Sequence, residues 1–419
     1  DSEQLGEVVV VGYGTSTKEE LTGSISIIDS EALEMMPKAS FQDALQGAAP
    51  GLQVVSNDGA PGASIAVRVR GIGWINASNE PLYISDGIPV TSGSISSTDF
   101  SNGGRSSNVM SSLNPNDIEN LIVLKDAAST AIYGSRGANG VVLITTKSGK
   151  AGTKAKIDVK ARWGSSDFAY NNLLTGLNRD QYEQLYLEGY VNAGTLTEQE
   201  ARDQFATQFP INPETGDYYD TNWIDEMTRS GFVQEYDGSV TGGTDKLSYF
   251  VSGNYFDQDG VVDQNYFTRL SGRANLNARV NDRLIISNNL SISSYEQRGI
   301  TDGTAWEAPF YLGILMAPTV PIYDLEGNFY ADHKGFFMGG NNPVGQLYDN
   351  IRTLRQTRFT DNLSASLEIV EGLTFKTAWS FDFITIREKV FENGRYGDGR
   401  NVGGTADVAQ NDVYKLVGT

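Results

Sequence analysis

The sequence predicts a large antiparallel transmembrane β-barrel preceded by a small α+β domain. Residues 21–147 mix short helices with short strands, whereas after Lys156 apolar and polar residues alternate with a period of two. The connections in this second part alternate between turns of a few residues and stretches of tens of residues, such as 165–231 and 299–356. Short turns at one end and long loops at the other are typical of outer-membrane barrels.

The chain begins with a valine-rich strand. Residues 7–14 read EVVVVGYG, so four consecutive valines run into Gly12, Tyr13 and Gly14. Such a segment favours a β-strand and must either pair with a second strand or be kept from water. From the residues alone, it is either an edge strand of the following domain or a free strand awaiting a partner.

The α+β domain follows from caps, turns and short apolar runs. Ser40 is a candidate N-cap for a helix over 41–46, which Pro50 and Gly51 end, and Gly134 ends a second helix over 127–133. Asp86 and Gly87 close one of the strands in a tight turn. The predicted strands cover residues 52–56, 65–71, 82–85, 121–124 and 141–146.

The second part reads as about seven long strands. In residues 268–280 the even positions carry Leu270, Leu276 and Val280, while the odd ones carry Arg269 and Arg273, so one face is apolar and the other polar. The predicted strands cover residues 157–163, 236–241, 247–256, 268–280, 283–295, 359–369 and 373–385. Tight turns at 281–282 and 371–372 join the last two pairs into hairpins.

A soluble antiparallel sandwich is the alternative to the barrel, with the apolar face covered by a second sheet. Strands of about ten to thirteen residues are longer than is usual in soluble sheets and suit a tilted membrane crossing. Seven strands cannot surround a domain of this size, which requires a barrel of the 22-strand class. We therefore expect this sequence to be the N-terminal portion of a longer barrel.

Composition excludes several classes of function. The 419 residues carry a formal net charge of -20, which argues against nucleic-acid binding. With no cysteine and a single histidine, His333, the chain offers no thiol nucleophile, no Ser-His-Asp triad and no multi-histidine zinc site. The segment VVVVGYGTST lacks the third glycine of a dinucleotide-binding motif, because Thr17 stands there. We expect no enzyme activity, no metal site and no cofactor.

Four ordered motifs resemble one family. They are EVVVVGYGT at 7–15, DALQGAAPGLQV at 43–54, VRVRGIG with PLYISDGIPV between 67 and 90, and NPNDIENLIVLKDAASTAIYGSRGANGVVLITTK at 114–147. Together they resemble the plug region of TonB-dependent outer-membrane transporters of the SusC/RagA-like branch, found in Bacteroidetes. The resemblance implies a TonB box and linker over 1–20, a plug over 21–150, and the first part of the barrel over 151–419.

The resemblance implies active import of an oligomeric nutrient, a glycan or a peptide, across a Gram-negative outer membrane. The implied partners are the periplasmic domain of TonB, a SusD-like surface lipoprotein and outer-membrane lipid. TonB would add a strand beside the TonB box. The implied TonB-binding residues are Glu7, Val8, Val9, Val10, Val11, Gly12 and Tyr13. Two alternatives stay open: a siderophore or cobalamin receptor of the same fold, and a SusC-like scaffold subunit of a larger outer-membrane assembly.

Charged and aromatic residues supply two further hypotheses. We expect Arg70 and Arg136 to pair with Glu119, Asp126 or acids of the barrel as a latch between plug and barrel, against the alternative that these charges are solvated. Aromatic and amide side chains of the long loops are candidate ligand contacts, although they suit membrane girdles equally well. The candidates are Trp74, Asn76 and Asn79, which follow the Arg-Gly motif of the plug, and Trp306, Phe336 and Phe337 of the long loops, where Trp223, Phe310 and Tyr311 also lie.

Overall fold

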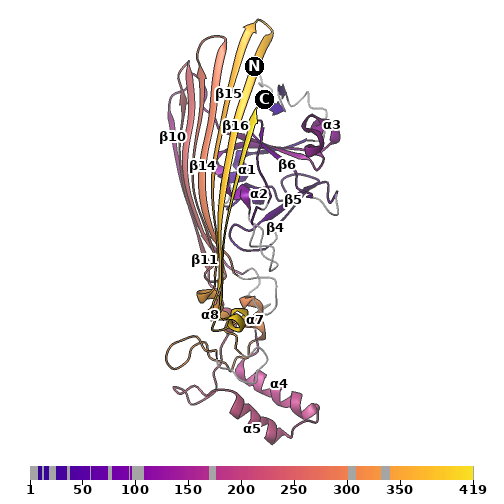
Figure 1. Cartoon of the computed structure of the whole chain (residues 1–419), viewed down its shortest axis with the longest axis vertical. Coiled ribbons are helices and arrows are strands. Elements are labelled where there is room, and N and C mark those ends of the chain that lie inside the picture. Colours follow the sequence, from indigo (N-terminus) through magenta and orange to yellow (C-terminus); the bar gives the residue numbers. More distant parts are fainter. Residues whose placement is uncertain are drawn as a thin grey trace.

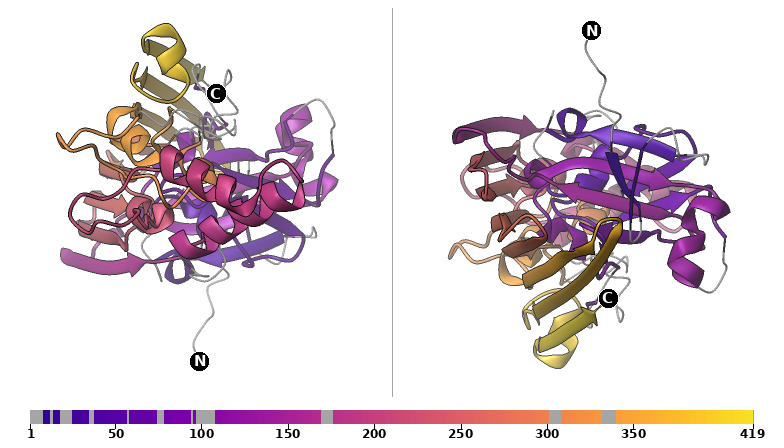
Figure 2. Two further views of the ribbon diagram at one scale, coloured as in Figure 1. Left: turned by 90° about the horizontal axis from the view of Figure 1, so that it is seen from below. Right: turned by 90° about the horizontal axis from the view of Figure 1, so that it is seen from above.

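The N-terminal domain lies against the concave face of a tall curved sheet, from one end of which a group of helices extends (Figures 1 and 2). In this computed structural model the described residues are 8–11, 14–17, 25–34, 38–56, 58–73, 78–93, 95–96, 108–168, 176–300, 308–331 and 340–418. We call the N-terminal domain the plug and the tall sheet the wall.

The plug is built around a five-stranded sheet with the strand order β3-β8-β9-β6-β7, in which β6 and β9 run parallel and the other neighbours antiparallel. Its strands are β3 (Ile25–Asp29), β6 (Leu82–Ser85), β7 (Ile88–Pro89), β8 (Ile118–Leu124) and β9 (Val141–Thr146). A separate hairpin joins β4 (Leu52–Ser56) to β5 (Ile65–Val69). Strand β8 begins three residues earlier than the sequence predicts, because the NPND turn leads directly into the sheet.

Short helices cover the plug sheet and close its core. They are α1 (Ser30–Glu34), α2 (Phe41–Ala44) and α3 (Ala127–Thr130), with 3₁₀ turns η1 (Val109–Ser112), η2 (Pro115–Asp117) and η3 (Ala131–Gly137). The side chain of Ser40 accepts a hydrogen bond from the backbone N–H of Gln42, as its N-cap role requires. The predicted helix over 127–133 is a short α-helix followed by a 3₁₀ turn, since Gly134 adopts a φ of 61°.

The valine-rich segment forms its own two-stranded sheet. Strand β1 (Val8–Val11) pairs antiparallel with β2 (Gly14–Thr17), and within the described residues neither strand joins the plug sheet. A two-stranded hairpin of this length has little stability of its own. The segment is therefore not an edge strand of the plug sheet in this structure.

The wall contains eight antiparallel strands in sequence order, one more than the seven predicted. They are β10 (Lys156–Ser166), β11 (Gly231–Gly243), β12 (Leu247–Asp259), β13 (Tyr266–Arg279), β14 (Leu284–Arg298), β15 (Ile351–Val370), β16 (Leu373–Glu392) and β17 (Thr405–Gly418). The prediction missed β17, which follows the 3₁₀ turn η4 (Asp398–Val402) and two adjacent glycines and carries few large apolar residues.

Burial on the wall is the reverse of that in a soluble sheet. On β13, Arg269 is 0% exposed and Arg273 7% exposed, while their neighbour Leu270 is 63% exposed. Val159 and Tyr414, on strands near opposite edges of the wall, are 77% and 78% exposed. Charged side chains such as Arg269 and Arg273 thus face the plug, together with a few buried aromatic and aliphatic ones such as Phe256 and Ile384. The exposed apolar side chains face outward, with no second sheet over them among the described residues. This arrangement confirms the barrel and contradicts the sandwich.

The two longest connections are folded and not extended loops. They contain α4 (Arg179–Asn192), α5 (Glu198–Gln208) and α6 (Trp223–Met227) between β10 and β11, and α7 (Pro309–Leu315) and α8 (Pro343–Asp349) between β14 and β15. The helices share an apolar core that includes Phe205, Trp223, Met227 and Leu312. Among the described residues, no helix combines the length and apolar character needed to cross a bilayer. We call these five helices the helical module (Figure 1).

Capping boxes start both long helices of the module. The Asn178 side chain caps α4 with Gln181, and the Thr197 side chain caps α5 with Glu200. The backbone N–H of Thr197, and then its hydroxyl, donate to the Glu200 carboxylate, which lowers the pKa of Glu200. The sequence prediction treated this stretch as a loop and overlooked these N-x-x-Q and T-x-x-E signals.

The start of α5 is expected to be sensitive to acid. Because the folded-state pKa of Glu200 is lowered, its contribution is present above the unfolded value of about 4.3 and is lost as pH falls through the folded value. Amide hydrogen exchange in the first turn of α5 should therefore be faster at pH values below that range than the intrinsic pH dependence of exchange explains. In Glu200→Gln the pH dependence should be absent, and an unchanged dependence would contradict the assignment.

Candidate functional site

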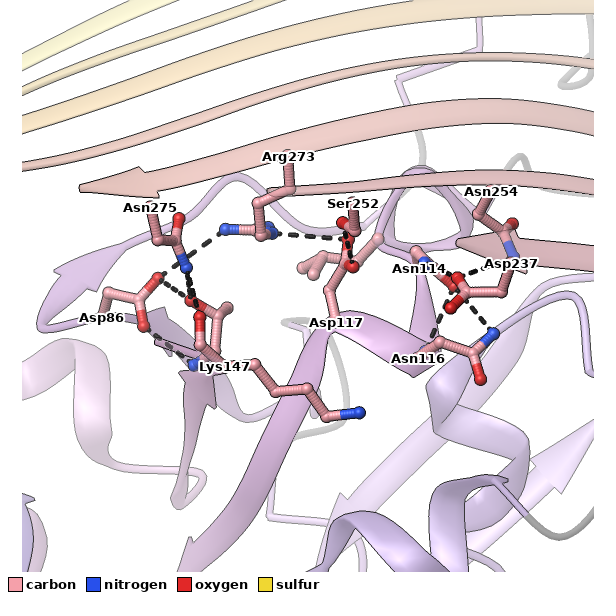
Figure 3. A network of polar contacts seen from close by, with 12 residues as sticks. Asp86, Asn114, Asn116, Asp117, Lys147, Asp237, Ser252, Asn254, Arg273 and Asn275 are labelled. Carbon is pink, nitrogen blue, oxygen red and sulfur yellow. Dashed lines mark hydrogen bonds and ion pairs between the residues drawn. The ribbon is translucent and has the colours of Figure 1, made fainter. Parts of the chain in front are cut away.

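The contact between the plug and strands β10 to β13 forms a network of polar side chains, which we call the seam (Figure 3). Its plug side is shaped by two capped 3₁₀ turns. The side chain of Asn108 accepts from the N–H of Met110, and that of Asn114 accepts from the N–H of Asn116, each at 3.1 Å. These caps fix the NPND turn so that Asn114, Asn116 and Asp117 face the wall.

Arg273 of β13 lies between two plug carboxylates (Figure 3). Its Nε is 3.4 Å from Asp117 Oδ2 and one terminal nitrogen is 3.9 Å from Asp86 Oδ2, with the arginine side chain only 6% exposed. Asp117 also accepts a 2.5 Å hydrogen bond from Ser252 Oγ on β12. Asp86 accepts from the backbone N–H and the hydroxyl of Thr146, each at 2.9 Å. One wall cation therefore joins two separate plug segments.

A second charged group joins the same turn to β10 and β11. Glu235 accepts from Asn116 Nδ2 at 2.6 Å and pairs with Arg162 at 2.5 Å. Asn114 Nδ2 donates to Asp237 Oδ2 at 3.2 Å. Buried carboxylates of the wall are thus provided with donors, as burial of charge requires.

Arg269 lies four residues before Arg273 on β13 and binds the plug backbone. Its Nη1 donates to the carbonyl oxygens of Ala39 at 2.7 Å and Ser111 at 3.0 Å, and its guanidinium lies 5.4 Å from the centre of the Phe256 ring. The residue is completely buried. It holds the end of η1 against the wall through main-chain atoms, so the contact does not depend on plug side chains.

The contact with strands β14 to β17 has a different character. Neutral side chains donate to plug carbonyls there, Gln297 to Pro61 at 2.9 Å and Asn411 to Ile95 at 2.9 Å, and the charged Lys415 donates to the carbonyl of Pro89 at 2.7 Å. Arg358 pairs with Asp382 inside the wall at 2.7 Å. The ion pairs of Arg273 with Asp86 and Asp117 join plug and wall on the β10 to β13 side.

The predicted latch residues lie elsewhere. Arg70, Glu119 and Arg136 are exposed, and the ion pairs found among the described residues are made by other side chains. Asp126 caps α3 by accepting from the N–H of Ser129 at 2.9 Å. Arg269 and Arg273 are on the polar strand face predicted from the sequence, but only the tertiary structure shows that this face contacts the NPND turn.

The predicted TonB-binding and ligand-contact residues are only partly within the described residues. Val8, Val9, Val10 and Val11 form β1. Asn79 Oδ1 accepts from the N–H of Gly73 at 2.8 Å and so closes a plug loop. The following lie outside the described residues: Glu7, Gly12, Tyr13, Trp74, Asn76, Trp306, Phe336 and Phe337.

Trp223, one of the long-loop aromatics considered as ligand contacts, is a core residue. It is 3% exposed, and its indole N–H donates to the carbonyl oxygen of Ala317 at 3.0 Å. The interpretation as a ligand contact is wrong for this residue, because packing within the helical module leaves almost none of its ring accessible.

A membrane-facing wall with a separately folded domain on its polar inner face defines a plugged transmembrane barrel, of which this chain contains eight strands. The family model of the TonB-dependent receptor plug domain matches residues 17–141. The chain is 34% identical to TonB-dependent receptor P26 of Formosa agariphila over 93% of this chain and 36% of that protein. It is 32% identical to TonB-dependent receptor SusC of Bacteroides thetaiotaomicron over 88% of this chain and 34% of SusC.

The solved structure of the RagAB peptide importer in its "open-open" state superimposes with a TM-score of 0.77 and 27% identity, covering 98% of this chain and 46% of that one. The chain thus spans about a third of the length of the curated relatives it matches. It corresponds to the N-terminal plug and first barrel strands of SusC/RagA-like TonB-dependent receptors, and the wall is a segment of an outer-membrane barrel.

Proposed function

We propose that the receptor to which this chain belongs imports an oligomeric nutrient across the outer membrane, driven by TonB. The observation that carries the proposal is the seam, in which ion pairs and hydrogen bonds join the plug to the wall beside small apolar clusters. Because water can replace the polar partners of these groups, the plug can be moved and returned without exposing a hydrophobic core.

TonB would engage the valine-rich segment by strand addition. Within the described residues, strand β1 pairs with β2 along one edge and has no neighbour along the other. The second edge can therefore accept a partner strand. The long-loop end of a barrel is extracellular and the short-turn end periplasmic. In Figure 1 the β1–β2 hairpin lies toward the short-turn end of the wall, where a periplasmic partner would reach it.

Strand addition by TonB can be tested with proline. We expect the double substitution Val9→Pro and Val10→Pro in the full-length receptor to abolish energised uptake, because proline cannot donate to a β-ladder. Ligand binding and the amount of receptor in the membrane should not change. The matched variant Val9→Thr with Val10→Thr keeps the main-chain donors and should retain uptake; equal loss in both variants would argue against backbone pairing.

We further propose a SusD-like surface lipoprotein as partner and a glycan or a peptide as cargo. The likeness to SusC and to the RagAB peptide importer supports this assignment. Mass spectrometry of the intact complex, purified gently from native membranes, tests it. One such lipoprotein per receptor supports an importer, whereas several unrelated stoichiometric subunits would point to a scaffold in a larger assembly.

The sequence-based latch also remains a proposal. Arg70 and Arg136 are exposed on the plug and are available to pair with acids of the complete barrel. We propose that such pairs, with Glu119 and Asp126 as further charged sites, add to the seam contacts. We also propose as ligand contacts the aromatic and amide residues named from the sequence, which are Trp74, Asn76, Asn79, Trp306, Phe336 and Phe337.

A further inference from the structure

A cavity lies where a plug loop meets the long-loop end of the wall and the helical module. Plug residues 59–61, the β12–β13 connection and α7 surround it, together with Phe168 after β10 and Ile300 after β14. Its volume is ≈ 380 Å³. We call it the junction pocket; its size is in the range of small-molecule binding sites.

The base of the junction pocket is firmly built. The N–H of Gly260 donates to the carbonyl oxygen of Asn265 at 2.7 Å, which closes the β12–β13 connection. The carbonyl oxygen of Pro61 accepts from Gln297 of β14 at 2.9 Å, which fixes the plug loop to the wall. A Cβ added to Gly62 would lie 2.2 Å from the Phe267 ring, so plug and wall are in close contact there.

The side chains of the lining are mostly apolar, and main-chain groups supply polar surface between them. Phe168 and Phe310 stack with ring centres 5.9 Å apart, and Tyr311 and Ile314 are each 46% exposed. No charged side chain lines the cavity among the described residues, and the only polar ones are Asn265 and Tyr311. Asn265 is 3% exposed, and its Oδ1 accepts no hydrogen bond in the described part of the chain.

Such a lining discriminates between the two cargo classes. A glycan carries hydroxyl groups around each ring, and those buried against apolar side chains have no hydrogen-bond partner. Burying a large apolar side chain of a peptide removes apolar surface from water, which is favourable, and the side chain needs no hydrogen-bond partner.

We propose that the junction pocket binds a large aliphatic or aromatic side chain of a peptide, and that the cargo of this receptor is peptide and not glycan. This inference rests on the proposed import function. The bound side chain contacts plug residues 59–61 directly. The Pro61 carbonyl is hydrogen-bonded to the wall, so a side chain bound in the pocket lies beside a contact between plug and barrel.

Gly59 belongs to the lining and has room for a larger side chain, so it permits a test of the pocket. A Cβ added there meets no heavy atom within 4 Å, and its φ is not in the left-handed region. Gly189 on α4 is an exposed glycine with equally open surroundings, away from the pocket, so Gly189→Leu is the matched control for Gly59→Leu. Both variants are made in the full-length receptor purified with its partner.

The probe is a tryptic digest of casein, with maltoheptaose as the glycan comparison. Peptides retained by the receptor in detergent are identified by mass spectrometry. The wild type and Gly189→Leu should enrich peptides rich in Leu, Ile, Phe or Met about tenfold over the digest, and Gly59→Leu should lose that enrichment. Binding of maltoheptaose, or equal enrichment in Gly59→Leu, would overturn the proposal. Since binding is measured without TonB, a failure of uptake alone would count against import and not against the pocket.

Discussion

Replacing Arg273 with methionine is expected to loosen the plug. The change leaves Asp86 and Asp117 buried at the seam without their shared cation, and removing one partner of a buried ion pair costs about 3–5 kcal/mol. Because the two carboxylates belong to different plug segments, both segments should be affected. Hydrogen exchange of residues 108–117 and 141–147 in the full-length receptor should increase, and the Tm should fall.

Three further variants separate charge from packing. Arg279→Met alters an exposed arginine on the same strand and should have no effect on exchange in the plug. Arg273→Lys keeps the charge but not the planar fork, and should give an intermediate result. Adding Asp117→Asn to Arg273→Met removes one uncompensated charge and should restore much of the protection. If the double variant exchanged faster than Arg273→Met, the electrostatic explanation would be wrong.

Truncating Trp223 to alanine is expected to destabilise the helical module by about 3–5 kcal/mol, the usual cost of removing a buried aromatic side chain. The indole packs among α6, α7 and the chain leading to Val320, so its loss opens a cavity shared by both long connections. Limited proteolysis should then cut within 176–230 and 308–331 at low protease concentrations, while the wall and the plug remain intact.

Trp223→Phe tests which part of the side chain matters. It keeps most of the packing but leaves the carbonyl of Ala317 without its donor, for which we expect a loss of about 1–3 kcal/mol. Leu185→Ala, at an exposed position of α4, serves as the control and should not change the cleavage pattern. Unchanged proteolysis of Trp223→Ala would show that the two connections fold independently of each other.

The elements most reliably predicted from the sequence are those set by local pattern. The period-two alternation over 268–280 identified a strand with one polar and one apolar face, and Ser40, Asp86 and Gly134 marked a cap and two turns. The two-residue side-chain period of a strand is a property of neighbouring residues, so it is visible without any tertiary information. The same holds for the capping boxes of α4 and α5, which were present in the sequence but not used.

The seam could not be predicted in the same way. Arg273 and Asp117 are separated by more than 150 positions, and nothing near either residue indicates the other. Arg70 and Arg136 looked equally suitable, because an arginine in a plug motif and one on a barrel strand have the same chemistry. Only the register of β13 against the NPND turn decides which arginine is buried with a carboxylate.

The sequence by itself therefore determined the class of fold, the polar inner face of the wall and the motifs of the plug, because each depends on residues close together in the chain. The tertiary structure decided which charges pair, that Trp223 is core, and that a plug loop, the wall and α7 enclose an apolar pocket. Those features arise where segments distant in sequence meet, and burial there sets the cost of leaving any group unpaired.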